Sequence, residues 1–109
     1  MSDVDLTLGR ENAYQRATTD TVDISATGTV LVVEVIGDCL VSVNIDGDAT
    51  ADYALDVSAD RNTWFEAEET YSGTDIRDTF RVGDRYLRLR VTTSASAGDE
   101  ARLTVQEAN

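Results

Sequence analysis

Alternating hydrophobic and polar residues make the segment from Tyr53 to Trp64 the clearest structural signal in the chain. One face of it carries Tyr53, Leu55, Val57 and Ala59, and the other carries Ala54, Asp56, Ser58 and Asp60. A period of two predicts a strand with one face in a core and the other in water. Asp60, Arg61 and Asn62 supply turn chemistry, because Asp and Asn side chains bond nearby backbone groups. Trp64 then opens a returning strand, so this segment predicts a hairpin.

The same alternation predicts further short strands before and after this hairpin. They are Thr21–Ser25, Thr29–Ile36, Cys39–Asp46, Phe65–Tyr71, Ile76–Val82, Tyr86–Thr92 and Ala101–Gln106. The sequence predicts turns or loops at residues 26–28, 37–38, 46–48, 72–75 and 83–84. It also predicts that residues 94–100 form the end loop of a further hairpin. The turn at 37–38 predicts a second hairpin. About eight short strands without a helical period predict an all-β antiparallel sandwich, jelly-roll or Ig-like, with no long helix.

A length of 109 residues fits one domain, which we expect to span residues 1–109. The first 19 residues begin with an alternating patch, Val4, Leu6 and Leu8, that predicts a first strand. The polar continuation is interpreted either as a surface loop or as an arm that lies on a neighbouring subunit. The start lacks the basic and apolar regions of a signal peptide, and no run is long enough to cross a membrane.

The charge balance changes the picture from a generic β domain to an unusual one. Lys and Arg together number 9 against 21 for Asp and Glu, which gives a net charge of -12, and the printed sequence contains neither Lys, His nor Pro. An acidic surface without Lys holds water and hydrated cations at high salt. The composition resembles proteins of extremely halophilic archaea and their viruses, the alternative being an ordinary acidic protein. Nucleic acid is an unfavourable partner, because phosphate binding requires cationic contacts.

Catalytic chemistry is excluded mostly by missing residue types. Without His or Lys, the usual general bases and Schiff-base amines are absent, and a glycosidase would need a carboxylate pair in an aromatic-lined cleft. We therefore expect neither an enzyme nor a cofactor. The lone Cys39 falls in an apolar pattern and is predicted to be a core residue. The oxygen ligands Asn44, Asp46, Asp48 and Asp52 form a weak calcium candidate that departs from the EF-hand pattern, so a solvated acidic turn is preferred.

Two features point to binding. Trp64 either closes the core over its hairpin or offers a ring face to a sugar. Nine acidic residues and no basic ones occupy residues 17–60, whereas 77–90 contain five arginines against two aspartates. An arginine patch on so acidic a chain predicts an interface with another copy or an acidic partner. The predicted interface residues are Arg77, Arg81, Arg85, Tyr86, Arg88 and Arg90.

Two short motifs carry a resemblance to known families. Val57-Ser58-x-Asp60-x-x-Thr63-Trp64 and Arg85-Tyr86-Leu87-Arg88-Leu89 together resemble a signature of galactose-binding-like and discoidin-type sandwiches, and similar hairpins occur in small β-sandwich structural proteins of tailed viruses. Together with the composition, the chain resembles a virion protein of a haloarchaeal tailed virus. That resemblance implies a non-enzymatic capsid decoration, turret or tail component, made in the host cytoplasm and incorporated into the virion. Its expected partners are further copies of itself and a capsid protein, and the alternative is a carbohydrate-binding module that uses Trp64.

Overall fold

The computed structural model describes residues 17–35 and 38–107, and within these ranges it consists of β-strands joined by loops, without a helix. The strands are β1 (Ala17–Asp23), β2 (Gly28–Glu34), β3 (Cys39–Ser58), β4 (Phe65–Val82), β5 (Tyr86–Thr93) and β6 (Glu100–Glu107). Every strand pair is antiparallel, so the predicted all-β antiparallel class is confirmed. The predicted first strand at Val4–Leu8 and the arm or loop up to residue 16 lie outside the described residues.

Six strands replace the predicted eight, because two predicted turns are bends inside long strands. The turn at 46–48 lies within β3, and the loop at 72–75 lies within β4. The bends face each other: Asp46 pairs with Asp75 and Ala51 with Gly73, so residues 47–50 stand opposite a single residue of β4. A bulge of this kind kinks a ribbon without ending it. The turn chemistry was therefore recognised correctly, but its outcome was wrong.

Gly47 explains why the two strands can approach so closely at the bend. A Cβ atom at this position would lie 3.1 Å from the backbone oxygen of Thr74 and 3.3 Å from that of Ala49. Across the bulge, Gly73 has a φ of 145°, which L side chains rarely adopt. Both glycines are thus required by the bent ribbon rather than by a reversal of the chain.

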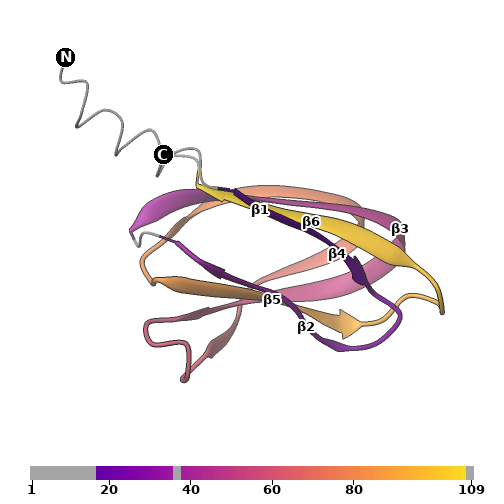
Figure 1. Cartoon of the computed structure of the whole chain (residues 1–109), viewed down its shortest axis with the longest axis horizontal. Coiled ribbons are helices and arrows are strands. Elements are labelled where there is room, and N and C mark those ends of the chain that lie inside the picture. Colours follow the sequence, from indigo (N-terminus) through magenta and orange to yellow (C-terminus); the bar gives the residue numbers. More distant parts are fainter. Residues whose placement is uncertain (1–16, 36–37, 108–109) are drawn as a thin grey trace, which may run out of the picture.

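The bent β3–β4 ribbon divides the molecule into two halves that lie over each other (Figure 1). The first half contains β1, β6, residues 39–47 of β3 and residues 75–82 of β4. The second half contains β2, β5, residues 52–58 of β3 and residues 65–73 of β4. The strands form one sheet in the order β1-β6-β3-β5-β2, with β4 on the other side of β3, and the end strands β1 and β2 approach each other. The fold is therefore a bent, nearly closed sheet of barrel-like form, and the two separate sheets of a sandwich are not confirmed.

Pairing between strands also corrects the predicted hairpins. The hairpin at Tyr53–Trp64 is confirmed, because Val57 pairs with Phe65. The second predicted hairpin, between the strands at 29–36 and 39–46, is wrong: β2 pairs with β5, and β3 pairs with β4, β5 and β6. The hairpin predicted at residues 94–100 is wrong too, because β5 pairs with β2 and β3 and β6 pairs with β1 and β3, so that residues 94–99 connect the two halves. Alternation identifies which face of a strand is apolar but not which strand lies beside it.

The core lies between the two halves and is built almost entirely from predicted inward positions. It includes Leu31, Val33, Cys39, Val41, Val43, Ile45, Tyr53, Leu55, Val57, Leu87, Leu89, Val91, Leu103 and Val105. Cys39 is fully buried, which confirms its prediction as a core residue. Burying these side chains on facing strands provides the main driving force for closing the bent sheet.

Candidate functional site

The end of the molecule formed by the β3–β4 hairpin is the most distinctive polar region of the described chain. Its loop is held by two side chains. The Ser58 hydroxyl accepts hydrogen bonds from the backbone N–H groups of Asp60 (3.2 Å) and Arg61 (2.9 Å) and donates one to the Asp60 carboxylate (3.0 Å). The Asp60 carboxylate in turn accepts the N–H groups of Asn62 (2.8 Å) and Thr63 (2.9 Å). These bonds fix the loop, which we call the hairpin tip (residues 58–65).

These bonds also have electrostatic and conformational consequences. The N–H groups of Thr63 and Asn62, and then the Ser58 hydroxyl, hold the pKa of Asp60 below its ordinary value. Arg61 is held in a left-handed conformation with a φ of 67°, which is uncommon for a residue other than Gly, Asn or Asp. The Ser-x-Asp-x-x-Thr-Trp motif is thus explained by loop geometry.

Asp56 forms the centre of a buried ion cluster on the outer face of the second half. Its side chain is 0% exposed, and its two carboxylate oxygens accept hydrogen bonds from three groups. The Arg88 Nε lies 2.5 Å away, the Arg90 Nε and Nη2 lie 2.6 and 3.0 Å away, and the backbone N–H of Ala67 lies 2.8 Å away. Arg88 also contacts Glu66 at 3.2 Å. The cluster therefore pairs two guanidinium groups with two carboxylates.

Burial would raise the pKa of Asp56, but the hydrogen bonds from Arg90, Arg88 and Ala67 outweigh it and hold that pKa below its ordinary value. Asp56 is therefore ionised near neutral pH. All of its oxygen lone pairs point at donors of the same chain, which leaves none for proton transfer to a substrate. The cluster is chemically saturated, and its geometry is that of a structural ion pair.

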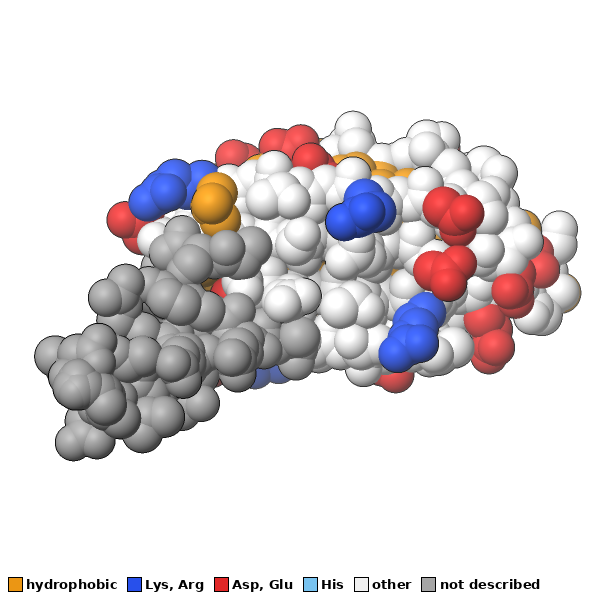
Figure 2. Space-filling model, turned by 90° about the horizontal axis from the view of Figure 1, so that it is seen from above, with side chains coloured by type: hydrophobic (Ala, Val, Ile, Leu, Met, Phe, Trp, Pro, Cys, Tyr) orange, Lys and Arg blue, Asp and Glu red, His pale blue; other side chains and the backbone are white. Residues whose placement is uncertain are grey.

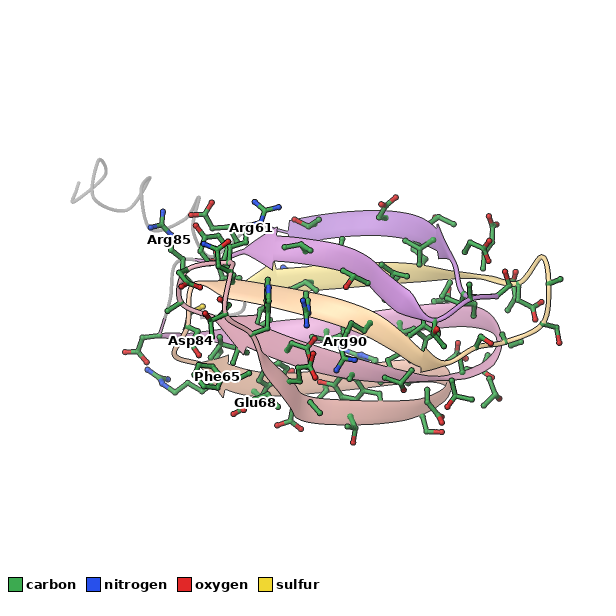
Figure 3. The ribbon with its side chains drawn as sticks, turned by 90° about the horizontal axis from the view of Figure 1, so that it is seen from below. Arg61, Phe65, Glu68, Asp84, Arg85 and Arg90 are labelled. Carbon is green, nitrogen blue, oxygen red and sulfur yellow. The ribbon has the colours of Figure 1, made fainter. Side chains whose placement is uncertain are left out.

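The two aromatic residues that begin β4 differ in exposure. Trp64 is half-buried outside the core, with the Arg88 guanidinium 4.5 Å from its ring centroid. Phe65 is 61% exposed and is the one large hydrophobic residue of the described chain that is exposed. Figure 3 shows Phe65 at the same end of the molecule as Arg61, Asp84 and Arg85, whereas Arg90 lies further along the second half. The interpretation that Trp64 closes the core is not supported, since it stacks on an arginine of the outer face.

The predicted interface arginines do not form one patch. Arg77 and Arg81 lie on the part of β4 in the first half, while Arg88 and Arg90 lie on β5 in the second half. Most are also bonded within the chain: Arg81 to Asp38 (3.1 Å), Arg85 to Glu34 (2.6 Å) and Arg77 to Asn44 (3.2 Å). Arg85 further lies 5.8 Å from the ring centroid of its neighbour Tyr86. Their role in assembly stays a prediction, but the hypothesis of a shared positive surface loses its geometric basis.

The residues of the weak calcium candidate lie near the bend without converging on one point. Asn44 accepts a hydrogen bond from Arg77, Asp52 accepts one from Ser72 (2.6 Å), and Asp48 accepts the Glu100 N–H (3.3 Å). Across the described ranges, no group of three or more acidic, Cys or His side chains is arranged to hold a metal ion. Nor does that part of the chain contain a helix of the length and apolarity needed to span a membrane.

Sequence reasoning assigned Asp56 to the wet face of its strand, and this was wrong. The two arginines at alternate positions of β5, Arg88 and Arg90, were a usable signal. Side chains two apart on a strand share a face, and two adjacent cations on a half-buried face need a carboxylate between them. What the sequence did not reveal is that β5 lies beside β3.

Comparison with known proteins yields a structural likeness but no family. No protein-family model matches the chain, and no curated protein matches it. Among solved structures, the chain is similar to the SPBc2 prophage-derived protein YomS, with a TM-score of 0.49 and 7% sequence identity over 84% of this chain and 94% of that chain.

Proposed function

We propose that this protein is a non-enzymatic structural component of a halophilic virus particle, a capsid decoration, turret or tail protein that acts through repeated protein–protein contacts. The proposal is supported by the contrast between a buried, fully paired carboxylate and an exposed aromatic side chain. The buried carboxylate Asp56 is saturated by its own arginines, and the large hydrophobic group left exposed, Phe65, lies at the tip of a hairpin. Saturated charges suit a scaffold, and an exposed aromatic on a fixed loop suits a docking contact.

The acidic composition supports the halophilic part of the proposal. Most carboxylates of the described chain are exposed or half-exposed. At the bend, Asp46 and Asp75 stand opposite each other in the β3–β4 pairing, and Arg102 is opposite Asp46 on β6. Such a surface repels itself at low ionic strength and is relieved when the Debye length falls to about 3 Å near 1 M salt. Arginines such as Arg81 and Arg85 reduce this repulsion only near the carboxylates they pair with, Asp38 and Glu34.

A salt series tests the halophilic part directly. Thermal unfolding of the purified chain from about 0.1 M to 3 M KCl should give a melting temperature that rises steadily, because repulsion is screened over that range. The same series with tetramethylammonium chloride separates screening from the binding of hydrated potassium. A melting temperature that does not change with salt would refute the halophilic interpretation.

The structural role is tested by locating the protein. Virus particles purified by density gradient from a culture that naturally produces the chain should contain it in a fixed ratio to the major capsid or tail protein. High-salt washing should leave that ratio unchanged. If the protein stays in the soluble fraction while intact particles lack it, the proposed role is wrong.

Carbohydrate binding through Trp64 remains the second candidate, but the structure gives it less support. Sugar stacking requires a free ring face, and the Arg88 guanidinium already occupies one face of Trp64 at 4.5 Å. A glycan array with the wild type and Trp64→Ala decides the matter. Binding that is lost in the variant while its circular dichroism is unchanged would favour the module over the virion scaffold.

A further inference from the structure

We infer that the hairpin-tip end is a two-fold contact between two copies of this chain, in which Phe65 packs at the centre and Arg61 of each copy pairs with Asp84 of the other. The inference rests on the proposed function, since it specifies one of the repeated contacts through which such a protein would act. It is carried by three features of the same end: an exposed aromatic, two opposite charges without a partner among the described residues, and a surface less acidic than that at the bend.

The unpaired charges are the first step. In the described chain, Arg81 and Arg85 at this end are bonded to Asp38 and Glu34. Arg61 and Asp84 instead make no side-chain hydrogen bond or ion pair with a described residue, although both lie at the end shown in Figure 3. One unpaired cation and one unpaired anion on one surface are self-complementary. A two-fold axis brings residue i of one copy to residue j of the other and j to i, so it pairs both at once.

The charge of the whole end is the second step. Its described residues carry three guanidinium groups (Arg61, Arg81, Arg85) and six exposed or half-exposed carboxylates (Glu34, Asp38, Asp60, Glu66, Glu68, Asp84), a net charge of -3 in a chain of -12. The opposite end, around the bend, carries two arginines (Arg77, Arg102) and seven carboxylates (Asp23, Asp46, Asp48, Asp52, Asp75, Asp99, Glu100). Figure 2 shows acidic side chains gathered toward one end of the face it presents. Two copies of so acidic a chain meet with least repulsion through their hairpin tips.

Phe65 and the rigidity of the tip are the third step. Aromatic and arginine side chains are enriched at the centres of interfaces, where water is excluded around them. The tip is already fixed by the Ser58 and Asp60 hydrogen bonds, so docking would cost little loop ordering. The free edge of β4 is a poorer contact, because Glu66, Glu68 and Glu69 line it and Ala67 turns its N–H inward to Asp56.

Charge exchange between the two partners tests this geometry. Arg61→Asp places two new carboxylates opposite the two Asp84 carboxylates, and Asp84→Arg places two new guanidinium groups opposite the two Arg61 side chains. Because like charges then meet at both contacts, each variant alone should raise the dimer dissociation constant at least tenfold. An equimolar mixture of the two should form a heterodimer with an affinity near the wild type, because all four charges are then complementary. Sedimentation equilibrium in about 2 M KCl measures all three cases.

Folding controls are available for both variants. Aspartate tolerates the left-handed conformation of residue 61 better than arginine does, so Arg61→Asp should fold. Arg102→Glu makes the same kind of charge reversal at the other end and should leave the dimer unchanged. Phe65→Ser should weaken the dimer by more than either charge variant, with an unchanged circular dichroism spectrum.

The outcomes separate this inference from the proposed function. A wild type that is monomeric at every concentration and salt, or a mixture that does not restore the dimer, overturns the two-fold contact. An oligomer that is insensitive to Arg61→Asp and Phe65→Ser but is dissociated by Arg102→Glu has its contact at the bend, which overturns the inference too. In each of these cases the chain can still be found in purified particles, so the proposed function is judged by that separate experiment.

Discussion

Two aspartates of β3 lie on the outer faces of the two halves and differ in burial and in their partners. Asp56, in the second half, is completely buried and bonded to Arg88 and Arg90. Asp46, in the first half, is exposed and lies directly opposite Asp75 in the pairing with β4. The difference arises from the neighbouring strand, since β5 places two arginines beside Asp56 while β6 places only Arg102 opposite Asp46.

The comparison shows how one acidic chain divides its carboxylates between structure and solvation. The outer face of the first half is lined with short polar side chains that bond across strands, as Thr19 does with Thr104 and Ser42 with Thr79. Such a face stays wet. The outer face of the second half is covered by arginine side chains and Trp64, so that Ala54, Asp56 and Ser58 are buried there. The outer face of the second half therefore carries a small buried polar cluster, separate from the apolar core between the halves.

The largest expected effect comes from removing the buried charge. Asp56→Asn keeps the size of the side chain but takes the shared carboxylate from Arg88 and Arg90, which are 18% and 24% exposed, and leaves only Glu66, which contacts Arg88 at 3.2 Å. Breaking a buried pair in this way costs about 3–5 kcal/mol of unfolding free energy. Denaturant unfolding in about 2 M KCl measures it.

Asp46→Asn is the matched control for this experiment. It removes the same charge from the same strand, but at an exposed position opposite another carboxylate, so it should be neutral or slightly stabilising. Equal destabilisation by the two substitutions would contradict the assignment of Asp56 as the centre of a structural cluster.

Acid should destabilise the fold through Asp56. The folded-state pKa of Asp56 lies below its ordinary value of 3.8, so its contribution to stability is present above that value and is lost as the pH falls through the lowered pKa. The unfolding free energy of the wild type should thus fall more steeply below pH 3.8 than that of Asp56→Asn. Parallel curves for the two proteins would show that Asp56 does not drive acid unfolding.

The apolar face of each strand was predictable, because alternation depends only on the period of a strand. Leu87, Leu89 and Val91 point inward as predicted, and so do Val41 and Val43. The two bends were not predictable. Asp46-Gly47-Asp48 has the composition of a turn, and only the pairing with residues 73–75 of β4 shows that the ribbon continues through it. Composition specifies that the backbone deviates, whereas tertiary pairing decides whether the chain reverses.

The candidate site was predictable in parts for the same reason. The loop chemistry of Asp60 and Asn62 depends on near neighbours and was recognised. The roles of Arg88 and Arg90 depend on Asp56, which is more than thirty residues away in the sequence. A run of arginines in sequence was interpreted as a patch in space, but a bent sheet distributes those residues over two opposite faces.

Trp64 offers an intermediate effect that sharpens the comparison. A core tryptophan would cost about 3–5 kcal/mol when replaced by alanine. Trp64 is half-buried and stacks on Arg88, so Trp64→Ala should cost only about 1–2 kcal/mol, from the lost cation–π contact and exposed arginine. A double-mutant cycle with Arg88→Ala measures their coupling, which should be absent between Trp64 and Arg81.

The smallest effect concerns the backbone that supplies Asp56 with its third donor. Ala67 has a φ of 56°, a left-handed conformation that turns its N–H toward the Asp56 carboxylate at 2.8 Å. The conformation costs an alanine about 1–2 kcal/mol, and glycine adopts it without that cost but loses about 0.5–1 kcal/mol of chain entropy on folding. Ala67→Gly should therefore stabilise the protein by about 0.5 kcal/mol in the wild type. In Asp56→Asn, the Ala67 N–H has lost its charged acceptor, so the backbone at residue 67 is no longer held in the left-handed conformation and can relax. The gain from glycine should then shrink toward zero, and a gain of equal size in both backgrounds would show that Ala67 is strained for a reason unrelated to Asp56.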